Sequence, residues 1–118
     1  EIVFGHNDFL AANFLDDGSK IWVVDWEYGG FNDPLFDIGG LASNNDFNQD
    51  LEKEALEMYY EKPLTNDVLL KYNSMKTASL LRETMWSMVS EITSKLDFDY
   101  GEYTQDNLSK FNEAFESL

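Results

Sequence analysis

The strand signals of this chain all lie in its first third, and helical periodicity fills the rest. Residues 2–4 form a short apolar run, and two further apolar runs, 13–15 and 21–24, flank the turn at 16–19. An Asp-Gly pair, here Asp17-Gly18, between two apolar runs predicts a β-hairpin. Because the strands come first and the helices follow as a block, we predict an α+β, mainly helical domain with one small hairpin.

Four helices are predicted downstream of residue 30, each from a capping residue that precedes a periodic apolar pattern. The first covers about 34–43, where Asn32-Asp33 offers a cap and Pro34 stands in the first turn, as the fixed φ of proline allows. Pro63 ends the second helix, which reaches about Tyr60. The predicted caps of the remaining three helices are Asp46, Thr65 or Asn66, and Thr104.

The third helix is the longest, because its apolar residues recur at steps of three and four over some 25 positions. We expect the face that carries them to be turned toward the core. These residues are Val68, Tyr72, Met75, Ala78, Leu81, Met85, Val89 and Ile92.

Charge and composition narrow the classes of function. The 118 residues are 43% hydrophobic, which suits one domain with a real core. Eight basic and 23 acidic residues give a net charge of −15, which disfavours nucleic acid and anionic lipid as partners and attracts small cations. The chain has no cysteine, so disulfides and thiolate metal sites are excluded. No apolar run approaches the roughly 18 residues of a membrane span, and we expect a cytoplasmic protein.

The densest group of reactive side chains is the ordered set His6, Asp8 and Asn13, followed by Asp25 and Glu27 at the end of an apolar strand. Phosphoryl transfer needs an acceptor for the proton of the attacking hydroxyl and oxygen ligands for magnesium on the nucleotide phosphates. Asp8 suits the first role, and Asn13 with Asp25 suits the second, because magnesium prefers hard oxygen donors. The alternative is an acidic loop with a coincidental spacing.

This segment resembles the catalytic and metal-binding loops of protein kinases, aminoglycoside phosphotransferases and choline kinases. The runs 25–28 (DWEY), 32–34 (NDP) and 36–39 (FDIG) are most similar to choline and ethanolamine kinases. The resemblance implies that residues 1–118 form a single domain, the C-terminal catalytic lobe of a protein-kinase-like fold. It implies Asp8 as the catalytic base, Asn13 and Asp25 as magnesium ligands, and Glu27 as a further acidic residue at the metal or the substrate.

Two residues are expected to support the loop structurally. In the family that the chain resembles, the histidine at the position of His6 packs and hydrogen-bonds to brace the catalytic loop, and a proton-shuttle role is the alternative. Asp37 is similar to an aspartate that supports the loop from the next helix, comparable to the outer shell of a metal site.

A second constellation lies downstream, where Trp86, Tyr100 and Tyr103 resemble the aromatic residues of a choline pocket, with Tyr28 as another wall. Aromatic faces are a natural way to hold a quaternary ammonium, which cannot donate a conventional hydrogen bond. The alternative is that these aromatic residues belong to the core. Glu83 stands where family members often carry a second tryptophan, and it could pair with a cationic head group, with Arg82 or with Lys76.

These features predict a kinase that transfers the γ-phosphate of ATP, with Mg²⁺, to the hydroxyl of choline, ethanolamine or a similar cationic amino alcohol. The phosphate-binding loop and lysine of such kinases belong to an N-terminal lobe that we do not find in this chain, so we expect the isolated chain to be inactive. Self-association into a homo-oligomer is a further expectation. The rival interpretations are an aminoglycoside or other small-molecule kinase, and a non-catalytic fragment that binds a ligand or a partner.

Overall fold

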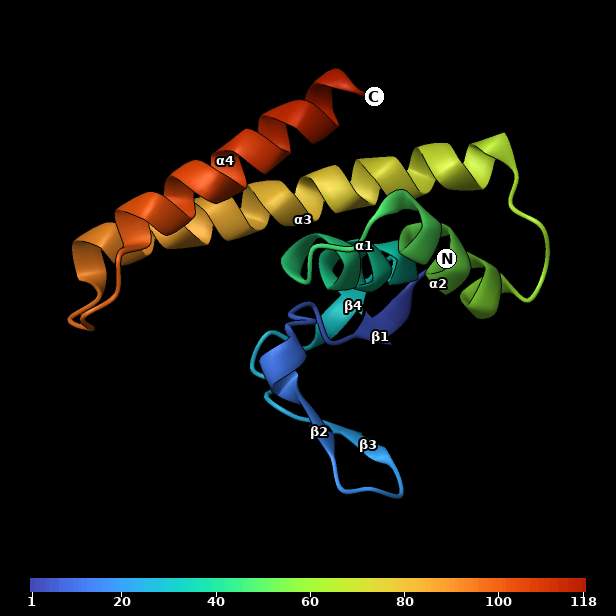
Figure 1. Cartoon of the computed structure of the whole chain (residues 1–118), viewed down its shortest axis with the longest axis horizontal. Helices are drawn as coiled ribbons and strands as arrows, with labels where there is room; N and C mark the ends of the chain where they lie inside the picture. Colours follow the sequence, from blue (N-terminus) through green and yellow to red (C-terminus); the bar gives the residue numbers. More distant parts are fainter.

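Two small two-stranded sheets and four helices make up the structure, a computed structural model that describes residues 1–118 (Figure 1). The α+β, mainly helical class predicted from the sequence is confirmed. In chain order the elements are β1 (Val3–Gly5), a 3₁₀ turn (Ala11–Asn13), β2 (Phe14–Asp16), β3 (Ile21–Val23), β4 (Gly30–Asn32), α1 (Pro34–Asn44), α2 (Gln49–Tyr60), α3 (Asn66–Thr93) and α4 (Tyr100–Glu116).

The predicted hairpin is present as the antiparallel pair β2 and β3, in which Phe14 lies opposite Val23. Its turn depends on Asp17, whose carboxylate accepts a hydrogen bond from Trp22 Nε1 at 2.7 Å and others from the backbone N–H groups of Ser19 and Lys20. Gly18 has a φ of +87°, a conformation that a side chain would strain. The hairpin projects away from the helices (Figure 1).

The second sheet was not predicted. It pairs β1 with β4 in antiparallel orientation, with Phe4 opposite Phe31 and Gly5 opposite Gly30. The sequence around β4 contains the pair Gly29-Gly30 and lacks the alternating pattern of a strand, so its pairing depends on where the rest of the chain places it.

Side-chain caps define the helix starts, and two of the predicted caps are wrong. Asp33 caps α1 and Thr65 caps α3 as predicted. Asn48 caps α2 in place of Asp46, because Asp46 has a φ of 54° in the connection before the helix. Asp99 caps α4 five residues before Thr104, which is buried inside the helix.

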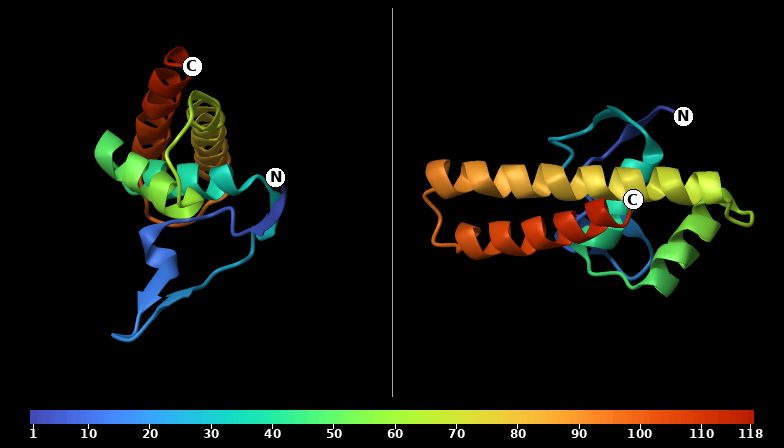
Figure 2. Two further views of the ribbon diagram at one scale, coloured as in Figure 1. Left: turned by 90° about the vertical axis from the view of Figure 1, so that its right-hand side faces the viewer. Right: turned by 90° about the horizontal axis from the view of Figure 1, so that it is seen from above.

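The hydrophobic core lies between α1, α2 and the first half of α3. Leu35, Ala42, Leu56 and Tyr72 are its buried members. Gly39 lets α1 and α3 approach closely, because a Cβ at this position would lie 2.7 Å from the Cα of Lys76. Figure 2 shows α1 crossing beneath α3, with α4 running alongside α3. No helix is both long enough and apolar enough to cross a membrane.

The second half of α3 differs from the prediction. The expected core stripe continues through Ala78, Leu81, Met85, Val89 and Ile92, yet these residues are exposed, and Ile92 reaches 87%. The face that packs on α4 is the polar one, and it carries the buried residues Glu83, Thr84, Ser87 and Ser90. Ser87 accepts a hydrogen bond from Thr104 Oγ1 at 2.8 Å and donates one to the Tyr100 carbonyl at 3.1 Å. Small hydrogen-bonding side chains therefore form the contact between α3 and α4.

Candidate active site

The loop between β1 and the 3₁₀ turn is anchored by Asp37 in the first turn of α1. The two carboxylate oxygens of Asp37 accept hydrogen bonds from the backbone N–H groups of His6 (2.8 Å) and Asn7 (2.7 Å). Gly5 allows this approach, because a Cβ there would lie 2.9 Å from Asp37 Oδ2. These contacts support the predicted bracing role of Asp37.

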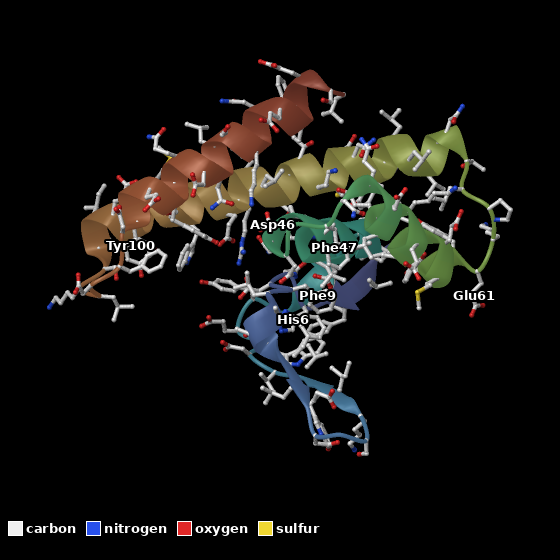
Figure 3. The ribbon with its side chains drawn as sticks, in the orientation of Figure 1. His6, Phe9, Asp46, Phe47, Glu61 and Tyr100 are labelled. Carbon is white, nitrogen blue, oxygen red and sulfur yellow. The ribbon has the colours of Figure 1, made fainter.

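His6 connects the loop to the hairpin. Its side chain is 1% exposed, its Nε2–H donates to the Val24 carbonyl at 2.7 Å, and its Nδ1 accepts from the Asp8 backbone N–H at 3.2 Å. The imidazole also packs against the rings of Phe9 and Trp26 at centroid distances of 5.1 and 4.7 Å. His6 and Phe9 lie together at the base of the hairpin, far from Tyr100 (Figure 3). Both ring nitrogens are engaged, which supports a bracing role.

Asn7 and Asn45 hold the same loop, and sequence reasoning missed both. Asn7 has a φ of 64°, and its Nδ2 donates to the Tyr28 carbonyl at 3.0 Å. The residue type itself was a hint of this loop conformation, because asparagine tolerates the left-handed region better than most residues. Asn45, at the end of α1, accepts from the Ala11 N–H at 3.0 Å and donates to the Phe9 carbonyl at 3.1 Å.

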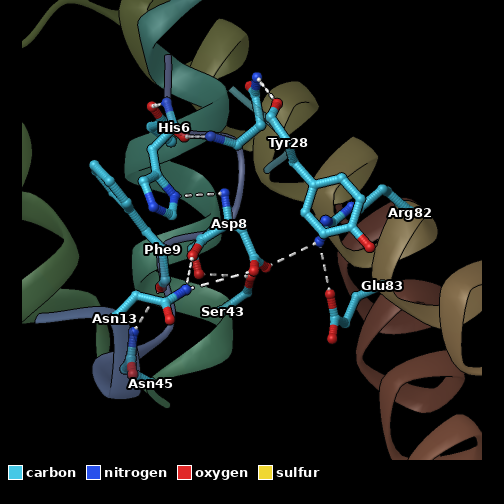
Figure 4. Close-up of polar contacts among 12 residues, drawn as sticks. His6, Asp8, Phe9, Asn13, Tyr28, Ser43, Asn45, Arg82 and Glu83 are labelled. Atoms are coloured by element: carbon cyan, nitrogen blue, oxygen red, sulfur yellow. Dashed lines mark hydrogen bonds and ion pairs between the residues drawn. The ribbon is translucent and has the colours of Figure 1, made fainter. Parts of the chain in front are cut away.

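Asp8 is held from two sides (Figure 4). Asn13 Nδ2 donates to the Asp8 carbonyl at 2.9 Å and lies 3.4 Å from Asp8 Oδ2. Arg82 Nη1, from α3, lies 3.3 Å from Asp8 Oδ1. The carboxylate is therefore oriented by an amide from its own loop and by a guanidinium from 74 positions downstream.

Asn13 and Asp25 come together because the hairpin pairs their flanking residues. The Val24 N–H donates to the Asn13 carbonyl at 2.9 Å, which places Asp25 one residue beyond this contact. Asn13 uses its Nδ2 on Asp8, and its Oδ1 makes no hydrogen bond within the chain. Asp25 has a φ of 65° and an exposed carboxylate that forms no ion pair.

These two residues fit a magnesium ion that is shared with nucleotide phosphates. No group of three His, Cys, Asp or Glu side chains is placed to hold a metal. Magnesium usually takes only one or two carboxylates from the protein and completes its shell with phosphate oxygens and water. The free Oδ1 of Asn13 and the carboxylate of Asp25 match that donor set, whereas the metal role of Glu27 stays a prediction.

A cavity of about 80 Å³ opens beside Asp8. Four of the predicted substrate residues, Glu27, Tyr28, Glu83 and Trp86, line it together with Asp8, Leu10 and Arg82. The other two predicted residues lie behind this lining. Tyr100 packs edge-on against Trp86 at a centroid distance of 5.9 Å, and Tyr103 donates its hydroxyl to Glu83 Oε1 at 2.7 Å.

Glu83 pairs with Arg82. Its Oε2 lies 2.9 Å from Arg82 Nη1, whereas Lys76 pairs with Glu52 at 2.9 Å. Burial, together with the hydrogen bond to Glu83 and the charge of that carboxylate, raises the pKa of Tyr103 well above its usual range. Tyr103 is thus kept as a neutral hydrogen-bond donor to Glu83.

Sequence reasoning did not assign Arg82 to the site. The residue contacts Asp8 and Glu83, and its Cζ lies 4.7 Å from the centre of the Tyr28 ring. One sequence feature could have drawn attention to this residue: Arg82 is the only arginine of the chain. A larger cavity of about 870 Å³ between the helices contains none of the predicted site residues.

Comparison with known proteins agrees with the family resemblance that the sequence shows. The family described as choline/ethanolamine kinase matches residues 1–54. Protein LicA of Haemophilus influenzae is 25% identical over 116 residues, which cover 96% of this chain and 42% of that protein. Ethanolamine kinase of Drosophila melanogaster is 31% identical over 123 residues, which cover 86% of this chain and 24% of that enzyme.

Among solved structures, a choline/ethanolamine kinase family protein from Mesorhizobium loti superposes with a TM-score of 0.89 at 28% identity. The match covers 98% of this chain and 40% of that protein. The chain thus spans less than half the length of these relatives. The motif, the helical lobe and these matches agree in one respect: the chain is similar to proteins of the choline/ethanolamine kinase family in sequence over residues 1–54 and in fold over nearly its whole length.

Proposed function

We propose that the protein carrying this chain is a kinase that transfers the γ-phosphoryl group of ATP to the hydroxyl of choline, ethanolamine or a similar small amino alcohol. Residues 1–118 would form its C-terminal catalytic lobe. The observation that carries the proposal is the position of Asp8, which lies beside Asn13 and also lines a cavity bounded by Tyr28, Trp86 and Glu83.

Asp8 is the proposed base. Its carboxylate opens onto the cavity, where an acceptor hydroxyl could donate a hydrogen bond to it. Asn13 holds Oδ2, so the carboxylate keeps one orientation while it orients the hydroxyl and takes its proton. Most of the acceleration in this reaction class comes from positioning and electrostatic stabilisation, and a fixed base serves the first of these.

Asn13 Oδ1 and Asp25 are the proposed magnesium ligands. Bound there with the nucleotide, magnesium would offset the charge on the phosphate oxygens. The backbone contact between Asn13 and Val24 fixes the spacing of the two ligands, and His6 fixes the distance of the hairpin from Asp8.

The cavity suits a small cation. Tyr28 and Trp86 offer aromatic faces that attract an ammonium group and cover its methyl groups. Glu27 and Glu83 add negative charge. A primary ammonium can also hydrogen-bond to these carboxylates, so the same lining serves ethanolamine.

The direct test uses the full-length protein with Mg-ATP and a panel of hydroxylated amines that includes choline, ethanolamine and an aminoglycoside. We expect ADP release that depends on choline or ethanolamine, with the phosphomonoester identified by phosphorus NMR. Preference for the aminoglycoside would assign the protein to the neighbouring family. Absence of turnover with every amine, in a protein that binds Mg-ATP, would contradict the proposal.

A further inference from the structure

The wall of the cavity beside Asp8 includes a cation, the guanidinium of Arg82. Arg82 Nη1 lies 3.3 Å from Asp8 Oδ1 and 2.9 Å from Glu83 Oε2, and its guanidinium carbon lies 4.7 Å from the centre of the Tyr28 ring (Figure 4). Two carboxylates and one aromatic face therefore converge on one guanidinium.

These are the groups that a cationic acceptor needs. An ammonium substrate placed with its hydroxyl against Asp8 would use the Tyr28 face and the nearby carboxylates. An ammonium group in this cavity would lie beside the guanidinium that lines it, so the two cations would repel one another and compete for the same partners.

The two ion pairs of Arg82, with Glu83 and with Asp8, differ in burial and in length. Glu83 is nearly buried, with 6% of its side chain exposed, and Tyr103 fixes its second oxygen at 2.7 Å. The Arg82 side chain is 27% exposed and belongs to a long, flexible residue type. Its single contact with Asp8, at 3.3 Å, is the longer of its two ion pairs. The guanidinium can therefore leave Asp8 and Tyr28 while it keeps its pair with Glu83.

We propose that Arg82 is a specificity-determining residue that occupies the cation subsite of the free protein, so that a cationic acceptor binds only by displacing its guanidinium from Asp8 and Tyr28. The inference rests on the proposed function, because it assumes that this cavity takes the acceptor. It makes Arg82 the residue that weakens the affinity for an ammonium group and sets how strongly the site prefers a charged acceptor over a neutral one.

The test compares Arg82→Gln with the parent in the full-length protein. Glutamine keeps N–H donors for Glu83 and removes the charge. Two acceptors are used: choline, and its neutral isostere in which carbon replaces nitrogen. We expect the ratio of kcat/KM for choline to that for the isostere to rise about tenfold, the value of one cation contact in a partly exposed site.

The matched control is Lys76→Gln, which removes another ion-paired cation from α3 at a position that does not line the cavity. It should leave the ratio unchanged. An unchanged or lower ratio in Arg82→Gln, with a melting temperature near that of the parent, would overturn the inference. A lower ratio would mean that Arg82 helps to bind the acceptor.

A second measurement is independent of turnover. Tetramethylammonium has no hydroxyl, so it probes the cation subsite alone. By calorimetry we expect it to bind Arg82→Gln about tenfold more tightly than the parent. If the parent turns over no amino alcohol, the proposed function fails. If the parent is active but both Arg82→Gln readouts stay at parental values, only the inference fails.

Discussion

His6 Nε2 donates to the Val24 carbonyl at 2.7 Å, and this contact joins the loop of the proposed base to the strand end of the proposed magnesium ligand. The other nitrogen of the same ring accepts from the Asp8 N–H. One buried imidazole therefore sets the separation between Asp8 and Asp25.

The first prediction follows from these two contacts. His6→Ala leaves a carbonyl and an N–H without their partner, and we expect it to lower the free energy of unfolding by about 1 to 3 kcal/mol in urea denaturation. His6→Gln offers an amide that can replace part of the bonding and should recover part of the loss. Full stability in His6→Ala together with lost turnover would instead indicate a role in proton transfer.

The second prediction separates base from metal ligand. In the full-length protein, Asp8→Asn should abolish turnover and leave Mg-ATP affinity mostly intact, because the residue acts on the acceptor hydroxyl. Asp25→Asn should weaken Mg-ATP binding as well as turnover. Calorimetric titration with Mg-ATP checks both. Equal losses of nucleotide affinity in the two variants would show that this division of roles is wrong.

The third prediction concerns Trp86, which is 40% exposed at the cavity. Trp86→Ala should raise the KM for choline about tenfold and leave the KM for ATP nearly unchanged, because an indole face attracts the cation. Ethanolamine should be affected less, since its ammonium can hydrogen-bond to carboxylates. A buried core tryptophan would instead cost about 3 to 5 kcal/mol of stability on truncation and impair both substrates alike. A thermal melt beside the kinetics distinguishes the two cases.

The fourth prediction uses the raised pKa of Tyr103. In the folded chain the neutral phenol is favoured, so the stability that it contributes is complete below the unfolded pKa of 10.0 and is lost as the pH rises toward the higher folded value. Urea denaturation from about pH 8 to 11 should show a steep loss of stability at the alkaline end. Tyr103→Phe should be less stable at neutral pH, because Glu83 loses a donor, and should lose less stability on alkalinisation. Parallel pH profiles for the two proteins would contradict the prediction.

The fifth prediction tests the polar contact between α3 and α4. Val89→Ser removes an exposed apolar side chain, and we expect a change in unfolding free energy within about 0.5 kcal/mol. Ser87→Leu inserts a larger group into the buried contact and breaks the bonds to Thr104 and Tyr100, which should cost about 1 to 3 kcal/mol. The reverse order of effects would mean that the apolar stripe is buried.

Much of the candidate site followed from local sequence signals. The Asp-Gly turn between two apolar runs determined the hairpin, and the hairpin in turn brought Asn13 beside Asp25. The caps of α1 and α3 were equally local, because a capping side chain bonds a backbone N–H only two or three residues away. The functional roles of these residues remain predictions that the variants above test.

Only the tertiary structure decided which face of α3 is buried and what lies against Asp8. Helical periodicity tells which residues share a face but not which face meets a partner, and on α3 the positions 81, 85, 89 and 92 recur as regularly as 83, 87 and 90. The docking of α4 through Ser87 and Thr104 selected the polar face. That choice turned Glu83 toward Tyr103 and brought Arg82 to Asp8 from 74 positions away, a contact that depends on helix packing and that no local pattern records.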